Sequence, residues 1–184
     1  MNDALNFAIS FILQVVSFVF VARFLLQACR VDFYNPISQG LVKITDPVLK
    51  PMRMVVPGYR NLDFASFLAA VVVQILLVMS LSALNGGGYV GSFGTIIASG
   101  VLQVVLECIR IFWWSILIVI IAGWIAPGTY HPALALLQQI TEPLLAPARK
   151  LLPPMGGIDF SPIIVFLILG VIERILPQVF MSML

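Results

Sequence analysis

Four long apolar runs divide the chain, and each is long enough to cross a bilayer as a helix. A membrane-spanning helix needs roughly 20 consecutive apolar residues. The runs cover residues 5–29, 64–84, 101–126 and 160–176. The third could begin as early as Thr95, and the fourth is short. A β-barrel would need short strands of alternating polarity, so the pattern predicts an all-α membrane protein with four transmembrane helices.

Glycine and proline mark the expected ends of these helices. Asn85-Gly86-Gly87-Gly88 follows the second run, and Ala126-Pro127-Gly128 closes the third. Ser161-Pro162 opens the fourth, with proline near the first helical position, where no backbone N–H is needed. The chain therefore predicts two hairpins, each formed by two spans and a connecting loop.

The two connecting loops are amphipathic. Apolar residues recur at near-helical spacing between polar ones over residues 37–55 and 134–152. A threonine, an acid and a proline interrupt each loop, at Thr45-Asp46-Pro47 and at Thr141-Glu142-Pro143. Threonine can cap a helix and proline can start one. Each loop is therefore predicted to hold two short helices that lie in the membrane interface with their leucines in the acyl boundary.

The loops belong to an internal repeat. Residues 34–64 align without a gap on residues 130–160, 96 positions further on. Identical residues in the first copy are Tyr34, Pro36, Leu41, Ile44, Thr45, Pro47, Leu49, Pro51, Arg53, Pro57, Asp63 and Phe64. We expect two repeat units, 1–92 and 93–184. Two spans per unit return the chain to its starting side, so the units form a parallel repeat.

Composition and charge place the chain in lipid and suggest its orientation. Hydrophobic residues make up 61% and charged residues only 10% of 184 residues, against about 25% charged in soluble domains. Seven of the basic residues lie in the repeated loops: Arg30, Lys43, Lys50, Arg53, Arg60, Arg149 and Lys150. Because basic loops stay in the cytoplasm, we expect both loops to be cytoplasmic and both termini to lie outside. The net charge of +2 does not favour a nucleic-acid partner.

Six repeated positions form a candidate structural motif at the lipid interface: Pro47, Arg53, Asp63, Pro143, Arg149 and Asp159. The arginines could bind lipid phosphate, pair with Asp63 and Asp159 to tie each loop to the next span, or anchor the loops in the headgroup region. The two aspartates stand just before a span. They could cap its helix or form a proton or cation site.

A polar face on the third span is the candidate intramembrane site. Gln103, Glu107, Arg110 and Trp114 are spaced by four, three and four residues, which places them on one helical face. Glu107 and Arg110 can pair along the helix. A charge at mid-membrane costs about 2.5–3.5 kcal/mol and marks a functional candidate. Two depths remain open: Arg110 lies near the centre if the span covers 101–123, but only one turn inside if it covers 107–126.

The other spans carry fewer polar groups. Ser10, Gln14 and Ser17 form a thin stripe on the first span, and Gln74 stands alone in the second. Hydrogen bonds between helices are the usual role of such residues. A pore lining is the alternative, and a channel of four-helix subunits would require a homo-oligomer.

Catalytic and cofactor chemistry is not indicated. The sequence has no Ser-His-acid set, zinc-protease motif or phosphate-binding loop. Two cysteines, Cys29 and Cys108, and one histidine leave little material for a metal or haem site. His131 stands where the first repeat has Asn35, which predicts a turn or cap. We expect no enzyme, no cofactor and no metal.

These motifs resemble the YggT family of bacterial membrane proteins, which has relatives in plastids. The resemblance rests on Asp32-Phe33-Tyr34-Asn35-Pro36, on Thr45-Asp46-Pro47 with Arg53, and on Thr141-Glu142-Pro143 with Arg149. It extends through Gly156-Gly157-Ile158-Asp159-Phe160-Ser161-Pro162 and covers nearly the whole chain in two copies. The first copy departs from the pattern, with Ala65-Ser66 in place of Ser-Pro.

The resemblance implies a multi-pass protein of the bacterial inner membrane and brings no catalytic residues. Members of the family are associated with osmotic or salt tolerance and ion uptake, with cell division or envelope organisation, and with cytochrome assembly or nucleoid distribution. We expect a non-enzymatic protein of envelope and ion or osmotic homeostasis that acts as an oligomeric channel or transport factor. The alternative is a scaffold or assembly factor that docks a membrane-protein partner through its amphipathic loops.

Overall fold

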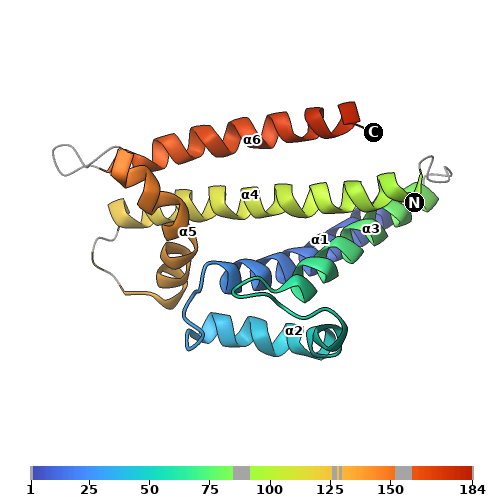
Figure 1. The fold of residues 1–184 in the computed structure, drawn as a ribbon, viewed down its shortest axis with the longest axis horizontal. Coiled ribbons are helices and arrows are strands. Elements are labelled where there is room, and N and C mark those ends of the chain that lie inside the picture. Colours follow the sequence, from blue (N-terminus) through green and yellow to red (C-terminus); the bar gives the residue numbers. More distant parts are fainter. Residues whose placement is uncertain (1, 85–91, 126–127, 129, 152–158, 184) are drawn as a thin grey trace. The chain divides into compact units, whose positions relative to one another are not determined.

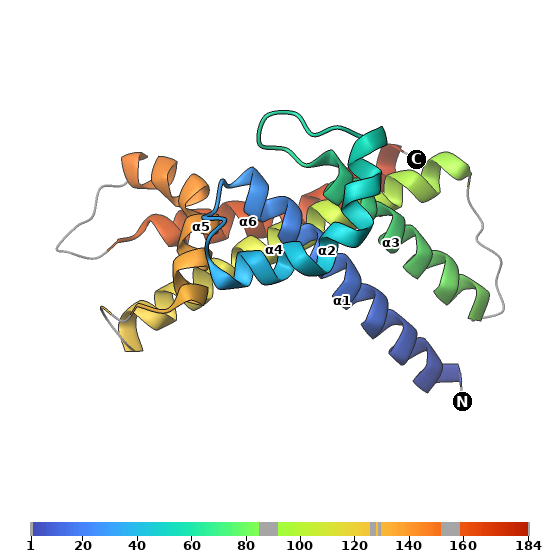
Figure 2. The same cartoon turned by 90° about the horizontal axis from the view of Figure 1, so that it is seen from below.

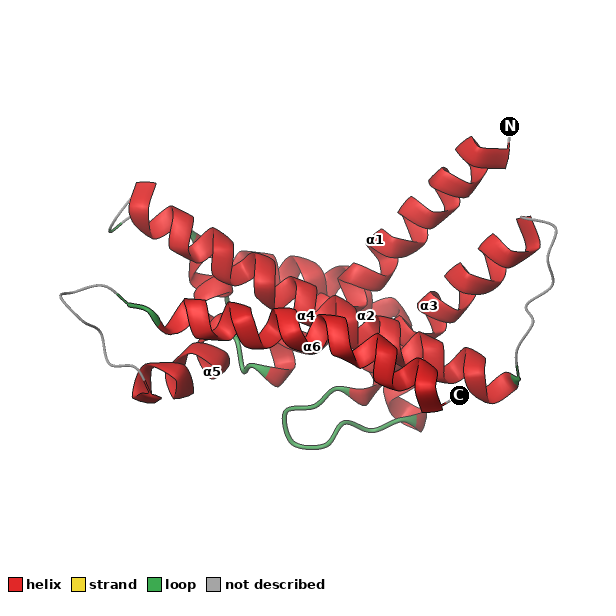
Figure 3. Ribbon diagram, turned by 90° about the horizontal axis from the view of Figure 1, so that it is seen from above, coloured by secondary structure: helices red, strands yellow, loops and turns green. Residues whose placement is uncertain are grey.

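The computed structural model describes residues 2–84, 92–125, 128, 130–151 and 159–183. This part of the chain folds into six helices: α1 (Asn2–Ala28), α2 (Pro36–Val55), α3 (Phe64–Leu84), α4 (Phe93–Ile125), α5 (Pro132–Leu151) and α6 (Ser161–Met183). The described residues form no strand (Figures 1 and 3). Tyr59 and Leu62 make one isolated bridge. The predicted all-α class is confirmed.

The four long helices α1, α3, α4 and α6 are apolar enough to cross a membrane, as predicted. The bounds of α3 are the predicted ones, but α4 begins eight residues before Val101 and α6 ends seven residues after Leu176. Ser92 explains the early start, because its Oγ caps α4 by accepting the N–H of Thr95 at 3.2 Å. The predicted breaks at 85–88 and at Pro127 lie outside the described residues.

The prediction of two short helices in each loop is wrong, because α2 and α5 are single helices with two prolines inside them. Thr45 and Thr141 do not cap: their hydroxyls donate to carbonyls one turn back, those of Leu41 at 2.8 Å and Leu137 at 3.0 Å. Each proline removes one helical hydrogen bond and bends the helix. All four prolines are exposed. Figure 1 shows α2 changing direction along its length.

The chain forms two compact units that do not coincide with the repeats. Unit 1 contains residues 1–24 and 41–108, and unit 2 contains residues 25–40 and 109–184. Helix α4 is therefore divided, with its first half in unit 1 and its second half in unit 2. Each unit is described separately below.

In unit 1, α1 and α3 run antiparallel and side by side (Figures 1 and 3). Their rings meet at Phe24 and Phe67, with centroids 5.4 Å apart. The first half of α4 approaches α3 closely at Gly100, where a Cβ would lie 2.8 Å from the side chain of Ile75. Small residues allow membrane helices to approach in this way, so Gly100 fixes the packing of α4 on α3.

In unit 2, the second half of α4 and α6 run antiparallel (Figures 1 and 2). The Trp113 and Phe166 rings pack with centroids 5.0 Å apart. The chain that follows α1 is held by α5: Asn35 Nδ2 donates to the carbonyl of Pro132 at 2.7 Å, and the N–H of Asp32 donates to Gln139 Oε1 at 2.7 Å.

Asn35 and His131 play the same local role, as the sequence predicted. Asn35 Oδ1 accepts the N–H of Ile37 at 2.9 Å, and His131 Nδ1 accepts the N–H of Ala133 at 3.2 Å. Each satisfies a donor in the first turn of its amphipathic helix. The exchange of asparagine for histidine therefore preserves a cap.

Candidate functional site

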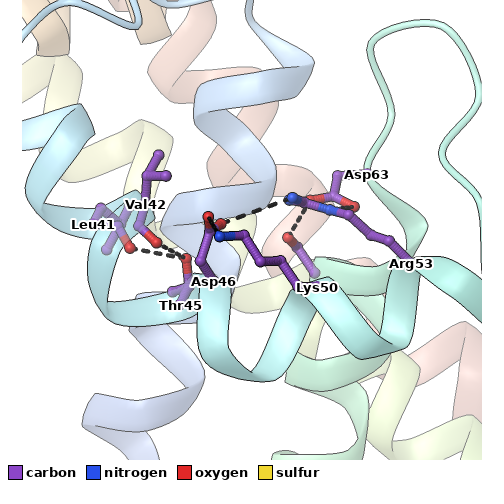
Figure 4. A network of polar contacts seen from close by, with 8 residues as sticks. Leu41, Val42, Thr45, Asp46, Lys50, Arg53 and Asp63 are labelled. Carbon is purple, nitrogen blue, oxygen red and sulfur yellow. Dashed lines mark hydrogen bonds and ion pairs between the residues drawn. The ribbon is translucent and has the colours of Figure 1, made fainter.

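The junction between α2 and α3 is an ion pair. Arg53, in the last turn of α2, makes two hydrogen bonds to Asp63, the residue before α3 (Figure 4). Nε donates to Oδ1 at 3.3 Å and Nη2 to Oδ2 at 2.5 Å. Ser66 Oγ also donates to Asp63 Oδ2, at 2.6 Å. Of the roles that the sequence left open for Arg53, the structure shows pairing with Asp63, which joins the loop helix to the next span.

Burial makes this first junction a strong one. The side chain of Asp63 is 1% exposed and that of Arg53 is 31% exposed. Burial raises the pKa of Asp63, but the hydrogen bonds from Arg53 and Ser66 and the charges of Arg53 and Arg23 outweigh it, so the pKa lies below its ordinary value. The hydrogen bond to Asp63 raises the pKa of Arg53. Both groups are therefore charged at neutral pH.

Further charges surround the first junction. Asp46 pairs with Lys50 at 3.3 Å and lies 3.8 Å from Arg53 Nη1 (Figure 4). Arg23, on α1, is buried and interacts electrostatically with Arg53, Asp63 and Asp46. The cluster links α1, α2 and the start of α3 within unit 1.

The second junction repeats the pairing in a more exposed setting. Arg149 Nε donates to Asp159 Oδ2 at 2.9 Å, and Arg149 Nη1 donates to Glu142 Oε2 at 2.8 Å. Asp159 Oδ1 accepts the N–H of Ser161 at 2.9 Å, which caps α6. The side chains of Arg149 and Asp159 are 40% and 37% exposed. Burial raises the pKa of Asp159, whereas Ser161 and Arg149 lower it by more, so the pKa lies below its ordinary value.

A second polar cluster lies within the membrane-spanning part of unit 1. Ser17 on α1 donates its hydroxyl to Glu107 Oε2 on α4 at 2.5 Å. Gln74 on α3 donates Nε2 to Ser17 Oγ at 2.9 Å and to Glu107 Oε2 at 3.1 Å. Ser17 and Gln74 are buried and Glu107 is half-buried. Three helices therefore bring three polar side chains to one point, which we call the Glu107 cluster.

The length of α3 fixes the depth of the Glu107 cluster. Helix α3 has 21 residues, which at about 1.5 Å per residue just covers a hydrocarbon core of about 30 Å. Gln74 has ten helical residues before it and ten after it. Because Gln74 bonds to Glu107, the carboxylate lies level with the middle of α3.

Arg110 is paired with a residue that the sequence analysis did not single out. Its Nε lies 2.9 Å from Glu173 Oε1 on α6, within unit 2. Arg110 and Glu173 also occupy the middle of their helices, with 17 and 12 helical residues before them. The pair places opposite charges against each other in the spanning region, which lowers the cost of burying either one.

The other members of the predicted face are not part of these contacts. Gln103 is half-buried in unit 1, and Trp114 is exposed in unit 2. Glu107 and Arg110 share a helix, but their side chains bond to residues of different helices. Among the described residues, no group of histidine, cysteine or acidic side chains could hold a metal ion. The Glu107 cluster itself contains a carboxylate, a hydroxyl and an amide that bond to one another.

Sequence reasoning missed how these residues combine. Ser17 was noticed as part of a thin polar stripe on the first span and Gln74 as a lone polar residue on the second, but pairing between runs has no linear signal. Glu173 was overlooked, although it lies inside the fourth span and an acid there is costly without a partner. A count of charged residues within the spans would have drawn attention to Glu173.

The fold and these contacts define a multi-pass membrane protein, because four apolar helices of this length contact the lipid bilayer. The sequence model of the CCB3/YggT family matches residues 2–84 and 98–180. The two matches are offset by the same 96 positions as the repeat. The chain belongs to the CCB3/YggT family, with one family unit in each half.

Similar proteins extend over nearly the full chain. A protein of Pseudomonas aeruginosa named Uncharacterized protein PA0392 is 39% identical over 175 residues, covering 93% of this chain and 89% of its own length. Uncharacterized protein YggT of Escherichia coli K12 is 37% identical over 172 residues, covering 93% and 88%. A Vibrio alginolyticus protein is 34% identical over 165 residues, covering 90% and 89%. No solved structure matches the chain.

Proposed function

We propose that this protein is a non-enzymatic component of the bacterial inner membrane that moves ions in envelope and osmotic homeostasis, as an oligomeric channel or transport factor. The Glu107 cluster is the observation that carries the proposal. A carboxylate near the membrane centre is costly, and here it is bonded by Ser17 at 2.5 Å and by Gln74 at 3.1 Å. Intramembrane ionisable groups of this kind mark ion pathways.

Ion flux into liposomes tests this function. Wild-type protein should raise the flux of protons or monovalent cations, and Glu107→Gln should lower it strongly, because the variant removes the intramembrane charge but keeps the side-chain size. Lys43→Gln on the exposed face of α2 is the matched control and should keep wild-type flux. A wild-type protein without flux, or equal flux in Glu107→Gln, would contradict the proposal.

The orientation is part of the proposal. Lysine and arginine are concentrated in the segments of α2 and α5, and the side with the basic excess is the cytoplasmic one. We propose cytoplasmic amphipathic helices with both termini outside. Cysteines introduced singly at Ser182 and at Lys43 should react with a membrane-impermeant maleimide from opposite sides, after Cys29 and Cys108 have been replaced. Labelling of both positions from one side would reject this topology.

A second candidate function is a scaffold or assembly factor. It is favoured by an exposed apolar stripe on α2: Ile37, Ile44, Val48 and Val55 follow helical spacing on one face. The repeat counterpart of Ile44 on α5 is Ile140, which is buried. Under this function Ile44→Ser should release a membrane-protein partner, Lys43→Gln should retain it, and no variant should show flux.

A further inference from the structure

We propose that Ser17, Gln74 and Glu107 form a proton-binding site at the membrane centre, with the Glu107 carboxylate as the group that takes up the proton. This inference rests on the proposed role in ion movement and names the ion. It uses three side chains from three helices of unit 1, namely α1, α3 and α4. Two of these, Ser17 and Gln74, are more than nine-tenths buried.

Two opposing forces make both protonation states of Glu107 accessible. The hydrocarbon environment favours the neutral acid, because an ionised group there loses its hydration. The two donors favour the carboxylate, because both deliver hydrogen to Oε2. The Ser17 Oγ to Glu107 Oε2 distance of 2.5 Å is that of a charge-assisted O–H···O⁻ bond, about 2.5–2.7 Å.

Ser17 allows the site to hold either state without moving a helix. A hydroxyl is both a donor and an acceptor. When Glu107 is ionised, Ser17 donates to its Oε2. When Oε2 has bound a proton, the new O–H donates to Ser17 Oγ, and the Ser17 hydroxyl turns to a helix carbonyl one turn back. The step balances as one proton added to one carboxylate, with no other bond made or broken.

The charges around the site are few. Helix α3 contains no ionisable residue. Helix α1 carries Asp3 and Arg23, and Arg23 lies about 9 Å along the helix from Ser17 at roughly 1.5 Å per residue. Helix α4 carries Arg110 one turn beyond Glu107, and Arg110 is paired with Glu173 at 2.9 Å. The charged residues of α2 in this unit are Lys43, Asp46, Lys50 and Arg53, and the last three pair in the junction cluster. Glu107 is therefore the carboxyl of unit 1 placed to titrate within the membrane.

A carbodiimide tests the site without relying on transport. Dicyclohexylcarbodiimide enters apolar environments and reacts with a protonated carboxyl to leave a stable acylurea, which mass spectrometry locates. In purified full-length protein we expect one modified residue, Glu107, with modification that falls as the pH is raised, because the reagent needs the protonated carboxyl. Glu107→Gln should lose the modification. Glu173→Gln, which removes the other intramembrane acid, should keep it.

Two further variants keep the carboxyl and remove the donors. Ser17→Ala and Gln74→Leu should each raise the proton affinity of Glu107 about tenfold, because one hydrogen bond to the ionised form is lost. Modification should then extend to higher pH in each variant. Modification that persists in Glu107→Gln, that never occurs in wild type, or that is unchanged in both donor variants would overturn the site. Slower modification in sodium chloride than in choline chloride at equal pH would overturn the proton assignment in favour of sodium.

The labelling separates this proposal from the proposed function. Modification of Glu107 in a protein that shows no flux would reject ion movement as the function and support the site. Flux that depends on Glu107 in a protein that is never modified would support the function and overturn the site.

Discussion

The repeated junctions at the ends of α2 and α5 differ from the polar groups at the membrane centre in one respect. Arg53–Asp63 has a full counterpart in Arg149–Asp159, 96 positions later. The Glu107 cluster has none, because the repeat positions of Ser17, Gln74 and Glu107 are Trp113, Gly170 and Phe11. What was duplicated ties a loop helix to a span. What is unique places an acid among three apolar helices, and this is the part to which the proposed ion movement is assigned.

The two junctions also differ from each other in burial. The side chain of Asp63 is 1% exposed, whereas that of Asp159 is 37% exposed. An ion pair that is largely solvated contributes little, while a buried acid depends on its partner. The same motif should therefore stabilise the first half of the chain more than the second.

The largest expected effect is the loss of Arg53. Arg53→Ala leaves Asp63 buried without its main partner, which should lower the free energy of unfolding by about 3–5 kcal/mol. Thermal unfolding in detergent measures it. The double variant Arg53→Ala with Asp63→Ala should lose less than the single variant, and a single variant as stable as wild type would show that the junction is not structural.

Breaking the Arg110–Glu173 pair should cause the second-largest loss of stability. Arg110→Leu leaves an acid in the membrane, at a cost of about 2.5–3.5 kcal/mol. Exchanging the two residues, with Arg110→Glu and Glu173→Arg together, should restore most of the lost thermal stability, since the 2.9 Å pair can form in either sense. If the exchange is no better than the single change, the pair does not join α4 to α6.

Low pH should remove part of the stability that the Arg53–Asp63 ion pair contributes. The folded pKa of Asp63 lies below its ordinary value, so its contribution is complete above an unfolded pKa of about 3.9 and is lost as the pH falls through the lower folded value. Stability followed from neutral pH downward should stay level and then fall below about pH 4. The fall should be smaller in Asp63→Asn; an equal fall would assign it to other acids.

The smallest effect belongs to the second junction. Arg149 and Asp159 are both more than a third exposed, so Arg149→Ala should cost at most about 1 kcal/mol. Thermal unfolding beside Arg53→Ala makes the comparison. Equal losses in the two variants would mean that burial does not distinguish the junctions.

Much of this fold could be predicted from the sequence because hydrophobic length and the repeat are linear signals. The bounds of α3, and the assignment of all four apolar runs as long helices, could be predicted from hydrophobic length alone. The prolines misled, because Pro47 and Pro143 suggested helix breaks, whereas their exposed position lets α2 and α5 continue through them. Contacts between residues far apart in the chain could not be predicted from a linear pattern. Glu107 was singled out because a charge in the membrane is costly, but its bonds to Ser17 and Gln74, and the pairing of Arg110 with Glu173, form only when the helices pack.

The central claim is that the repeated segment builds the protein and the unrepeated acid performs its activity. Proton flux into liposomes, measured for equal amounts of folded Arg149→Ala and Glu107→Gln protein, tests it most directly. The account predicts near wild-type flux for Arg149→Ala and loss of most of the flux for Glu107→Gln. Flux lost in Arg149→Ala and retained in Glu107→Gln would contradict it.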